Sequence, residues 1–130
     1  MKNALVILAG GKGRRFGKKT PKQFYKIGKS TIINTFFDNL EIKYFDIIVV
    51  SIEKKYRFII RNYCKKFNNK NKFIFSEPGK SRQRSSYNSL KKINSYKIKN
   101  VLIHDAARPF CSNKLISKIL NQLKKSNNAI

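Results

Sequence analysis

Acidic residues are scarce in this chain of 130 residues: six Asp and Glu stand against 30 Lys and Arg. Cysteine is rarer still, and Cys64 and Cys111 are too few and too far apart for a disulfide framework or a zinc ribbon. This pattern favours a reducing compartment. No apolar run approaches the roughly 18 residues of a membrane-spanning helix, and the N-terminus lacks the pattern of a secretory signal. We therefore expect a cytoplasmic protein without a membrane partner.

The excess of cations gives a formal net charge of +24, which raises the question of nucleic-acid binding. The cations are mostly lysines, spread from Lys2 to Lys125, and Lys-Lys pairs recur in segments that we expect to be helical. No zinc-finger or RNA-binding motif accompanies them. We interpret the charge as a lysine-rich surface and expect no specific nucleic-acid partner. The alternative is a basic module that binds RNA or DNA without catalysis, with a steep dependence on salt.

Continuous apolar runs alternate with segments of helical periodicity, and the length fits one domain. Apolar runs without polar alternation indicate a parallel sheet that is covered on both faces. The strand–helix order, repeated four times, predicts a doubly wound α/β fold. Residue 30, a serine, is the expected N-cap of the first helix. The expected strands are 3–9, 45–51, 73–75 and 101–104, and the expected helices are 31–40, 54–66, 82–93 and 113–125.

Three polar loops, 10–29, 76–85 and 105–112, follow the carboxyl ends of the expected strands, where open α/β sheets bind ligands. The first loop begins with Gly10, Gly11 and Gly13, followed by several cations. Glycines let the backbone approach a phosphate closely, so a polyphosphate is the natural ligand of such a loop. The loop has neither the GK[ST] ending of a P-loop nor a complete GxGxxG. Taken alone, it would equally fit a tight turn among solvated lysines.

Three motifs together resemble one family. AGGKGRRFGKKTPKQF, GKSRQRSSYNSL and VLIHDAARPF are similar, in this order, to the motifs of 2-C-methyl-D-erythritol 4-phosphate cytidylyltransferases. The resemblance implies a Rossmann-like, doubly wound, mostly parallel sheet of the nucleotidyltransferase type. It also implies the transfer of a cytidylyl group from CTP to a polyol phosphate, with release of pyrophosphate, in non-mevalonate isoprenoid biosynthesis. Because members of the family are substantially longer, residues 1–130 resemble the N-terminal nucleotide-binding portion of a single cytidylyltransferase domain that is truncated here.

The resemblance also implies roles for individual residues. Arg15 and Lys22 match the family's transition-state stabilisers, a role for which a guanidinium fork and a point charge are suited. Gly13 matches the close turn around the phosphates. Backbone contacts to the nucleotide are expected from Ala9, Gly10 and Gly11.

The other two motifs carry the remaining expected site residues. Gly79 and Ser85 match positions that hold cytosine and ribose, while Arg82 is expected to pair with phosphate or with an acidic loop. Asp105 is expected near CTP and the metal-bound phosphates, with Mg²⁺ held directly or through water. Arg108 is expected to brace its loop or to contact the ligand.

A few positions depart from the family pattern or leave alternatives open. Lys80 lies where the family often has an acidic residue, and His104 is expected to orient Asp105 or to pack at the strand end rather than to act as a base. The family's later elements, including its dimer arm, are not in the chain. We therefore expect a homodimer when full length and little activity from residues 1–130 alone. Ribitol 5-phosphate cytidylyltransferase is the nearest alternative, because it shares the first motif.

Overall fold

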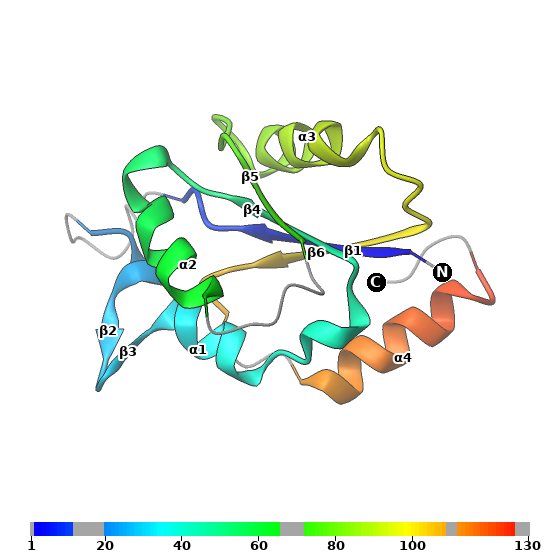
Figure 1. Cartoon of the computed structure of the whole chain (residues 1–130), viewed down its shortest axis with the longest axis horizontal. Helices are drawn as coiled ribbons and strands as arrows, with labels where there is room; N and C mark the ends of the chain where they lie inside the picture. The colour runs from blue at the N-terminus through cyan, green and yellow to red at the C-terminus, as the bar shows by residue number, and fades with distance from the viewer. Residues whose placement is uncertain (1, 12–19, 66–71, 109–111, 127–130) are drawn as a thin grey trace.

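Four parallel strands form the central sheet of the computed structural model, which describes residues 2–11, 20–65, 72–108 and 112–126 (Figure 1). The strands are β1 (Asn3–Leu8), β4 (Ile47–Ser51), β5 (Lys72–Ser76) and β6 (Asn100–Asp105). Their spatial order is β5-β4-β1-β6, and all three pairings are parallel. The predicted parallel α/β sheet is confirmed, with strand ends within three residues of those expected.

The first strand lies inside the sheet, between β4 and β6, which explains its continuous apolar sequence. Val6 pairs in register with Val49 of β4 and Ile103 of β6. Because side chains alternate across a strand, Leu5 and Ile7 face one core cluster while Ala4 and Val6 face the other. Both faces of β1 are therefore covered, as predicted.

Helices lie on both faces of the sheet (Figure 1). On one face lie α1 (Ile32–Asn39), α2 (Arg57–Cys64) and α4 (Asn113–Leu123), whose buried side chains join the larger core cluster. On the other face, α3 (Arg82–Ile93) lies over β5, β4 and β1. Among the described residues, no helix combines the length and the apolar character needed to cross a membrane.

Side-chain caps explain where three of the helices begin. Thr31, Ser81 and Ser112 each accept a hydrogen bond from a backbone N–H three residues later, at the starts of α1, α3 and α4. The prediction that Ser30 caps the first helix is wrong by one residue, because Oγ1 of the next residue, Thr31, accepts the hydrogen bond from the N–H of Asn34. The second helix begins later than predicted, since the short 3-10 helix η4 (Lys54–Tyr56) precedes it.

The loop predicted over 10–29 contains structure that the sequence pattern did not indicate. The 3-10 helix η2 (Lys22–Phe24) is followed by a hairpin of β2 (Lys26–Ile27) and β3 (Ser30–Thr31), in which Gly28 has φ of 67°. A second short 3-10 helix, η3 (Ile42–Tyr44), precedes β4. The η2 turn is anchored because the buried ring of Phe24 stacks on Tyr56, with ring centroids 4.4 Å apart.

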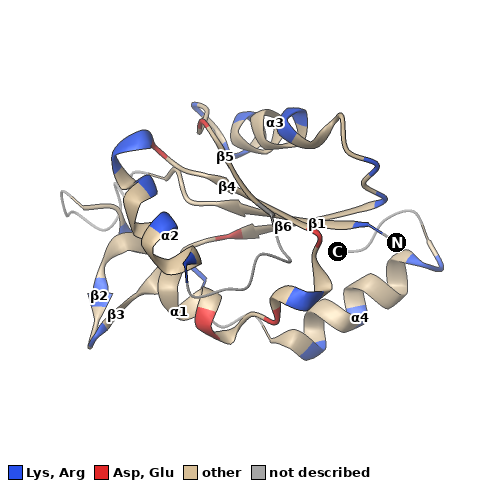
Figure 2. Cartoon of the chain, viewed as in Figure 1, with Lys and Arg blue, Asp and Glu red and all other residues tan. Residues whose placement is uncertain are grey.

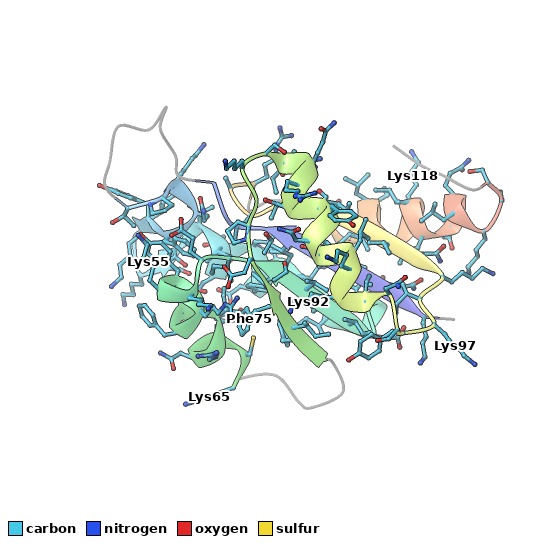
Figure 3. The ribbon with its side chains drawn as sticks, turned by 90° about the horizontal axis from the view of Figure 1, so that it is seen from above. Lys55, Lys65, Phe75, Lys92, Lys97 and Lys118 are labelled. Atoms are coloured by element: carbon cyan, nitrogen blue, oxygen red, sulfur yellow. The ribbon has the colours of Figure 1, made fainter. Side chains whose placement is uncertain are left out.

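Lysine and arginine side chains are distributed over the described surface rather than gathered on one element. Figure 2 shows cations on α2, α3 and α4 and on the β2–β3 hairpin, whereas α1 carries none. Figure 3 places the labelled Lys55 and Lys65 near α2, Lys92 and Lys97 near α3, and Lys118 on α4. This dispersion fits the interpretation of a lysine-rich surface.

Candidate nucleotide-binding site

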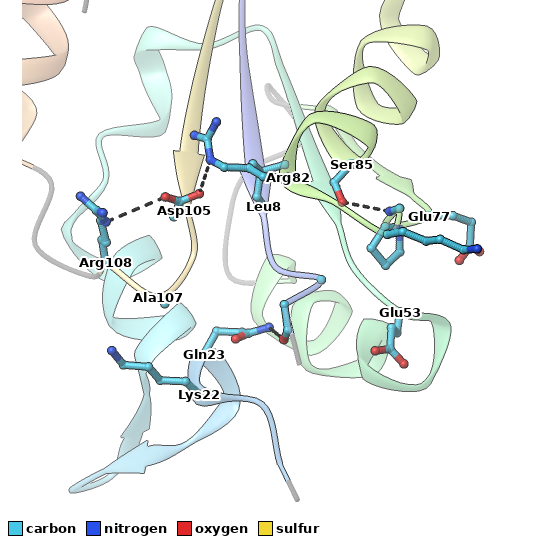
Figure 4. Close-up of a pocket in the computed structure, with 15 residues that line it drawn as sticks. Leu8, Lys22, Gln23, Glu53, Glu77, Arg82, Ser85, Asp105, Ala107 and Arg108 are labelled. Carbon is cyan, nitrogen blue, oxygen red and sulfur yellow. Dashed lines mark hydrogen bonds and ion pairs between the residues drawn. The ribbon is translucent and has the colours of Figure 1, made fainter. Parts of the chain in front are cut away.

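The carboxyl ends of the parallel strands open into a cleft of about 1250 Å³. Its walls come from the turns after β1 and β4, from η2, from the β5–α3 turn and from the end of β6 (Figure 4). These walls include three of the chain's six acidic residues: Glu53, Glu77 and Asp105. Eight of the predicted site residues line the cleft: Gly10, Gly11, Lys22, Gly79, Arg82, Ser85, Asp105 and Arg108.

Three other predicted site residues do not line the cleft wall that the structure describes. Arg15 and Gly13 lie outside the described residues, so their roles stay predictions. Ala9 is buried behind the turn, where its N–H donates to the carbonyl oxygen of Ser51 at 2.8 Å. Its carbonyl oxygen accepts a hydrogen bond from Gln23. Ala9 thus helps to form the turn, and its predicted contact with nucleotide is untested.

The glycine turn is packed closely against the β5–α3 turn. A Cβ added at Gly10 would overlap the side chain of Pro78, whereas a Cβ at Gly11 would meet nothing within 4 Å. The two glycines therefore have different reasons to be present. Gly10 lets two loops meet, and Gly11 leaves the backbone open to the cleft.

Gln23 fastens this turn from the other side and was not predicted as a site residue. The residue is only 4% exposed, and its Nε2 donates to the carbonyl oxygens of Ala9 at 2.8 Å and Gly11 at 3.0 Å. The residue lies in the PKQF part of the first motif, in which Lys22 is the residue predicted for the site. Nothing in the local sequence indicates that this polar side chain is buried.

Lys22 precedes Gln23 in η2 and is an exposed cation of the cleft. The short helix is held at both ends, because Pro21, which precedes it, and Phe24, its last residue, are both buried. The backbone of Lys22 is therefore fixed, while its exposed side chain lines the cleft. This placement agrees with the predicted role of Lys22 and does not test it.

The β5–α3 turn is closed by a hydrogen bond between two predicted site residues. The N–H of Gly79 donates to Oγ of Ser85 at 2.9 Å, and Ser85 is 7% exposed. A Cβ at Gly79 would overlap Arg84, so a larger residue does not fit without movement. Ser85 lies in the first turn of α3, whose cap is Ser81. Ser85 therefore supports the loop and also lines the cleft.

The end of β6 carries an ion-pair cluster. Nε of Arg82 lies 3.1 Å from Oδ1 of Asp105, and Nε of Arg108 lies 3.9 Å from Oδ2 (Figure 4). The two arginine side chains are 61% and 80% exposed. Of the two expectations for Arg82, the acidic partner is the one present in this structure. Exposed pairs of this kind exchange partners readily, because water screens them.

His104 packs at the strand end, as one of the two expectations had it. Its ring stacks on Phe36 with centroids 4.7 Å apart, and its Nε2 lies 2.8 Å from the carbonyl oxygen of Arg108. Because a carbonyl oxygen only accepts, Nε2 carries the proton and donates. His104 thereby holds the loop that carries Arg108.

Two carboxylates on the wall near β4 and β5 were missed by sequence reasoning. Oε1 of Glu77 lies 3.1 Å from Nη2 of Arg57 and 3.9 Å from Nζ of Lys54, and Glu53 pairs with Lys55 at 3.7 Å. The cleft therefore carries cations beside the glycine turn and acidic groups at its β4–β5 side. The one feature of the sequence that could have pointed to Glu53 and Glu77 is the scarcity of acidic residues, since half of the six line this cleft.

The sequence matches the family IspD, 2-C-methyl-D-erythritol 4-phosphate cytidylyltransferase, over residues 3–130. The bifunctional enzyme IspD/IspF of Pelagibacter ubique is 42% identical over 126 residues, covering 95% of this chain and 32% of that protein. The 2-C-methyl-D-erythritol 4-phosphate cytidylyltransferase of Clostridioides difficile is 39% identical over 130 residues, covering 94% of this chain and 52% of that enzyme.

Solved structures show the same fold. The 4-diphosphocytidyl-2C-methyl-D-erythritol synthase of Anaerococcus prevotii superposes with a TM-score of 0.79 at 25% identity, covering 96% of this chain and 52% of that one. The bifunctional IspDF of Campylobacter jejuni superposes with a TM-score of 0.68 at 30% identity, covering 96% of this chain and 31% of that one. The chain thus spans about half the length of the single-activity relatives and about a third of the bifunctional ones.

Proposed function

Because the chain belongs to the 2-C-methyl-D-erythritol 4-phosphate cytidylyltransferase family, we propose that its cleft binds CTP for cytidylyl transfer to 2-C-methyl-D-erythritol 4-phosphate. The observation that carries this proposal is the meeting of three sequence motifs at one cleft. The glycine turn, Lys22, the Gly79–Ser85 turn and Asp105 come from segments far apart in the chain, and all line it. Ligand sites of open parallel sheets lie at this end of the strands.

The proposed reaction is an in-line displacement at phosphorus. A phosphate oxygen of the polyol phosphate forms a bond to the α-phosphorus of CTP. The bond from that phosphorus to the oxygen bridging to the β-phosphorus breaks, and pyrophosphate leaves with the electron pair. The attacking phosphate is already anionic at neutral pH, so positioning and charge neutralisation carry most of the catalysis. This role suits Lys22 and, from the resemblance, Arg15.

The cleft offers one set of groups to the phosphate end of CTP and another to its nucleoside end. The glycine turn and Lys22 offer backbone N–H groups and positive charge, which favour the triphosphate. On the β5–α3 turn, Gly79 and Ser85 form a fixed hydrogen-bonded pair suited to reading base and ribose. Arg82 and Arg108, at the end of β6, provide exposed guanidinium groups for phosphate or for the acceptor.

Mg²⁺ fits this cleft as an ion carried mainly by the nucleotide. Asp105 offers one carboxylate at the end of β6, and the described residues contain no cluster of three or more His, Cys, Asp or Glu that could hold a metal. Mg²⁺ commonly binds one or two carboxylates together with phosphate oxygens and water. Asp105 would hold it, and the bound ion would neutralise charge on the phosphates. The carboxylate of Asp105 would then no longer pair with Arg82 and Arg108.

Calorimetric titration with CTP, UTP and ATP in Mg²⁺ tests the nucleotide part of this proposal. We expect CTP to bind most tightly. Lys22→Ala should weaken CTP binding by about tenfold or more, equivalent to about 1.4 kcal/mol. Lys26→Ala removes the same charge from the neighbouring hairpin, outside the cleft, and should leave affinity unchanged. Equal affinity for the three nucleotides, with salt-sensitive RNA binding, would instead support the basic-module alternative.

The identity of the acceptor is tested by pyrophosphate release with CTP, Mg²⁺ and either of two polyol phosphates. We expect release with 2-C-methyl-D-erythritol 4-phosphate in protein that carries this chain. Release with ribitol 5-phosphate alone would select the other cytidylyltransferase. A homodimer and a cytoplasmic location belong to the same proposal and rest on the resemblance. Sedimentation analysis tests the dimer.

A further inference from the structure

Gln23 has a side chain whose amide group meets two acceptors at once. Nε2 donates one proton to the carbonyl oxygen of Ala9 and the other to that of Gly11, so the amide spans Gly10. Among the uncharged side chains, only those of Gln and Asn can donate two protons from one atom. The orientation of the amide follows from its partners, since both are carbonyl oxygens that can only accept. A glutamate of the same size could not make this pair of contacts.

These two contacts determine which groups of the turn are available to an anion. In a planar trans peptide the C=O and the following N–H point in opposite directions. Because the Ala9 carbonyl is held toward Gln23, the N–H of Gly10 lies on the side away from it. The carbonyl oxygens of Ala9 and Gly11, which would repel phosphate, are engaged by a donor. The turn is thereby made compatible with an anionic ligand.

The same residue joins the turn to the predicted catalytic cation. Lys22 and Gln23 are adjacent in η2, and Phe24 anchors that helix against Tyr56. On the opposite side, Pro78 packs against Gly10. The turn is therefore held between an apolar contact and a pair of hydrogen bonds. Any movement of Gln23 would displace the backbone of Lys22 relative to the glycines.

We propose that Gln23 is a positioning residue, which holds the glycine turn in an anion-receptive conformation and sets Lys22 against it. This inference deepens the proposed function, on which it rests, by assigning a residue that acts through its neighbours rather than on the reacting atoms. The group it serves is the polyphosphate part of the ligand. The affinity for cytidine, which carries no phosphates, should therefore not depend on Gln23.

The test compares Gln23→Met, which keeps the length without donors, with Gln23→Glu, which puts a carboxylate opposite two carbonyls. Gln83→Glu makes the same chemical change at an exposed position of α3. Calorimetry with CTP, tripolyphosphate and cytidine measures the effect. In Gln23→Met, the loss of two hydrogen bonds should weaken the binding of CTP and of tripolyphosphate about tenfold or more. Gln23→Glu should weaken the binding of both ligands further. Cytidine binding should be equal in all variants.

A spectroscopic measurement separates positioning from simple loss of folding. In ¹H–¹⁵N spectra of the wild type, we expect the Gly10 and Gly11 amide signals to shift when tripolyphosphate is added. In Gln23→Met these shifts should shrink, while the signals of β4 stay at their native positions. Unaltered shifts and wild-type affinity in Gln23→Met would overturn the inference, as would equal losses for cytidine and tripolyphosphate.

The outcomes distinguish this inference from the proposed function. Wild-type protein that binds tripolyphosphate through Gln23 but does not prefer CTP would contradict the proposed function and leave the role of Gln23 standing. Preferred binding of CTP that is insensitive to Gln23→Met would contradict only the role of Gln23. Wild-type protein that binds neither ligand would overturn both.

Discussion

Gln23 and Asp105 line the same cleft but are held by different chemistry. Gln23 is buried and bonded to two neutral carbonyls, whereas Asp105 is partly exposed and paired with two exposed arginines. Buried neutral hydrogen bonds are insensitive to salt and costly to leave unmade. Exposed ion pairs contribute little stability and exchange partners easily. The glycine-turn wall is thus formed before a ligand arrives, while the β6 wall can re-pair with phosphate or metal.

The Gly79–Ser85 contact belongs with the preformed wall. Its acceptor is buried, its donor is a backbone N–H, and its loop leaves no room for a Cβ at Gly79. The two preformed turns also meet, since Pro78 packs against Gly10. Rigid turns beside a wall of exchangeable charges suit a site that must receive a polyphosphate and release pyrophosphate.

Replacing Gly10 should break the preformed wall most severely. Gly10→Ala forces a Cβ into Pro78, and overpacking of this kind lowers the free energy of unfolding by about 1–3 kcal/mol. Gly11→Ala is the matched control, because its Cβ would meet open space, and it should stay within about 0.5 kcal/mol. Urea unfolding measures both. Equal stability of the two variants would mean that the two turns are not in rigid contact.

Removing the Ser85 hydroxyl should have the next largest effect on stability. Ser85→Ala leaves the N–H of Gly79 without its acceptor, and we expect a loss of about 1–2 kcal/mol in the free energy of unfolding. Ser86→Ala is the neighbouring control. Its hydroxyl donates only to the carbonyl oxygen of Arg82 within the helix, so the change should be nearly neutral. Thermal unfolding of the two variants checks this, and similar losses would argue against a special role for Ser85.

The ion-pair wall should give the smallest change in stability. Arg82→Gln removes the shorter pair with Asp105, and such exposed pairs are typically worth less than about 1 kcal/mol. Arg108→Gln, at 3.9 Å and 80% exposure, should cost even less. Both differences should diminish in high salt, unlike those of Gly10→Ala and Ser85→Ala. A salt-independent loss as large as that of Ser85→Ala would abolish the distinction between the two walls.

Much of the fold was predictable because the strands are buried on both faces. The runs NALVIL and IIVVS are continuous and apolar, and each lies inside the sheet as β1 and β4. Loop positions followed from the strand ends, so the loops carrying Gly10, Gly79 and Asp105 were expected at one edge. The hairpin over Lys26–Thr31 was missed because its strands have two residues each, too short to establish a period.

Within the site, sequence reasoning found charged and glycine residues and missed the groups that hold them. Gln23 is buried by contacts with residues 12 and 14 positions away, which no local pattern records. Glu53 and Glu77 reach the cleft because β4 and β5 pair in parallel and end side by side. Of the two expectations for His104, orienting Asp105 or packing at the strand end, the structure shows the packing, and the partners Phe36 and the Arg108 carbonyl come from the folded arrangement.

The sequence by itself determined the alternation of strands and helices and the loops in which the motifs lie, because local apolar periodicity and turn chemistry are written in neighbouring residues. Only the tertiary structure decided that Arg82 faces Asp105, that Pro78 closes on Gly10 and that Gln23 turns inward to bond the glycine turn. Each of these contacts joins residues from different elements. The parallel order β5-β4-β1-β6 brings them to one edge of the sheet.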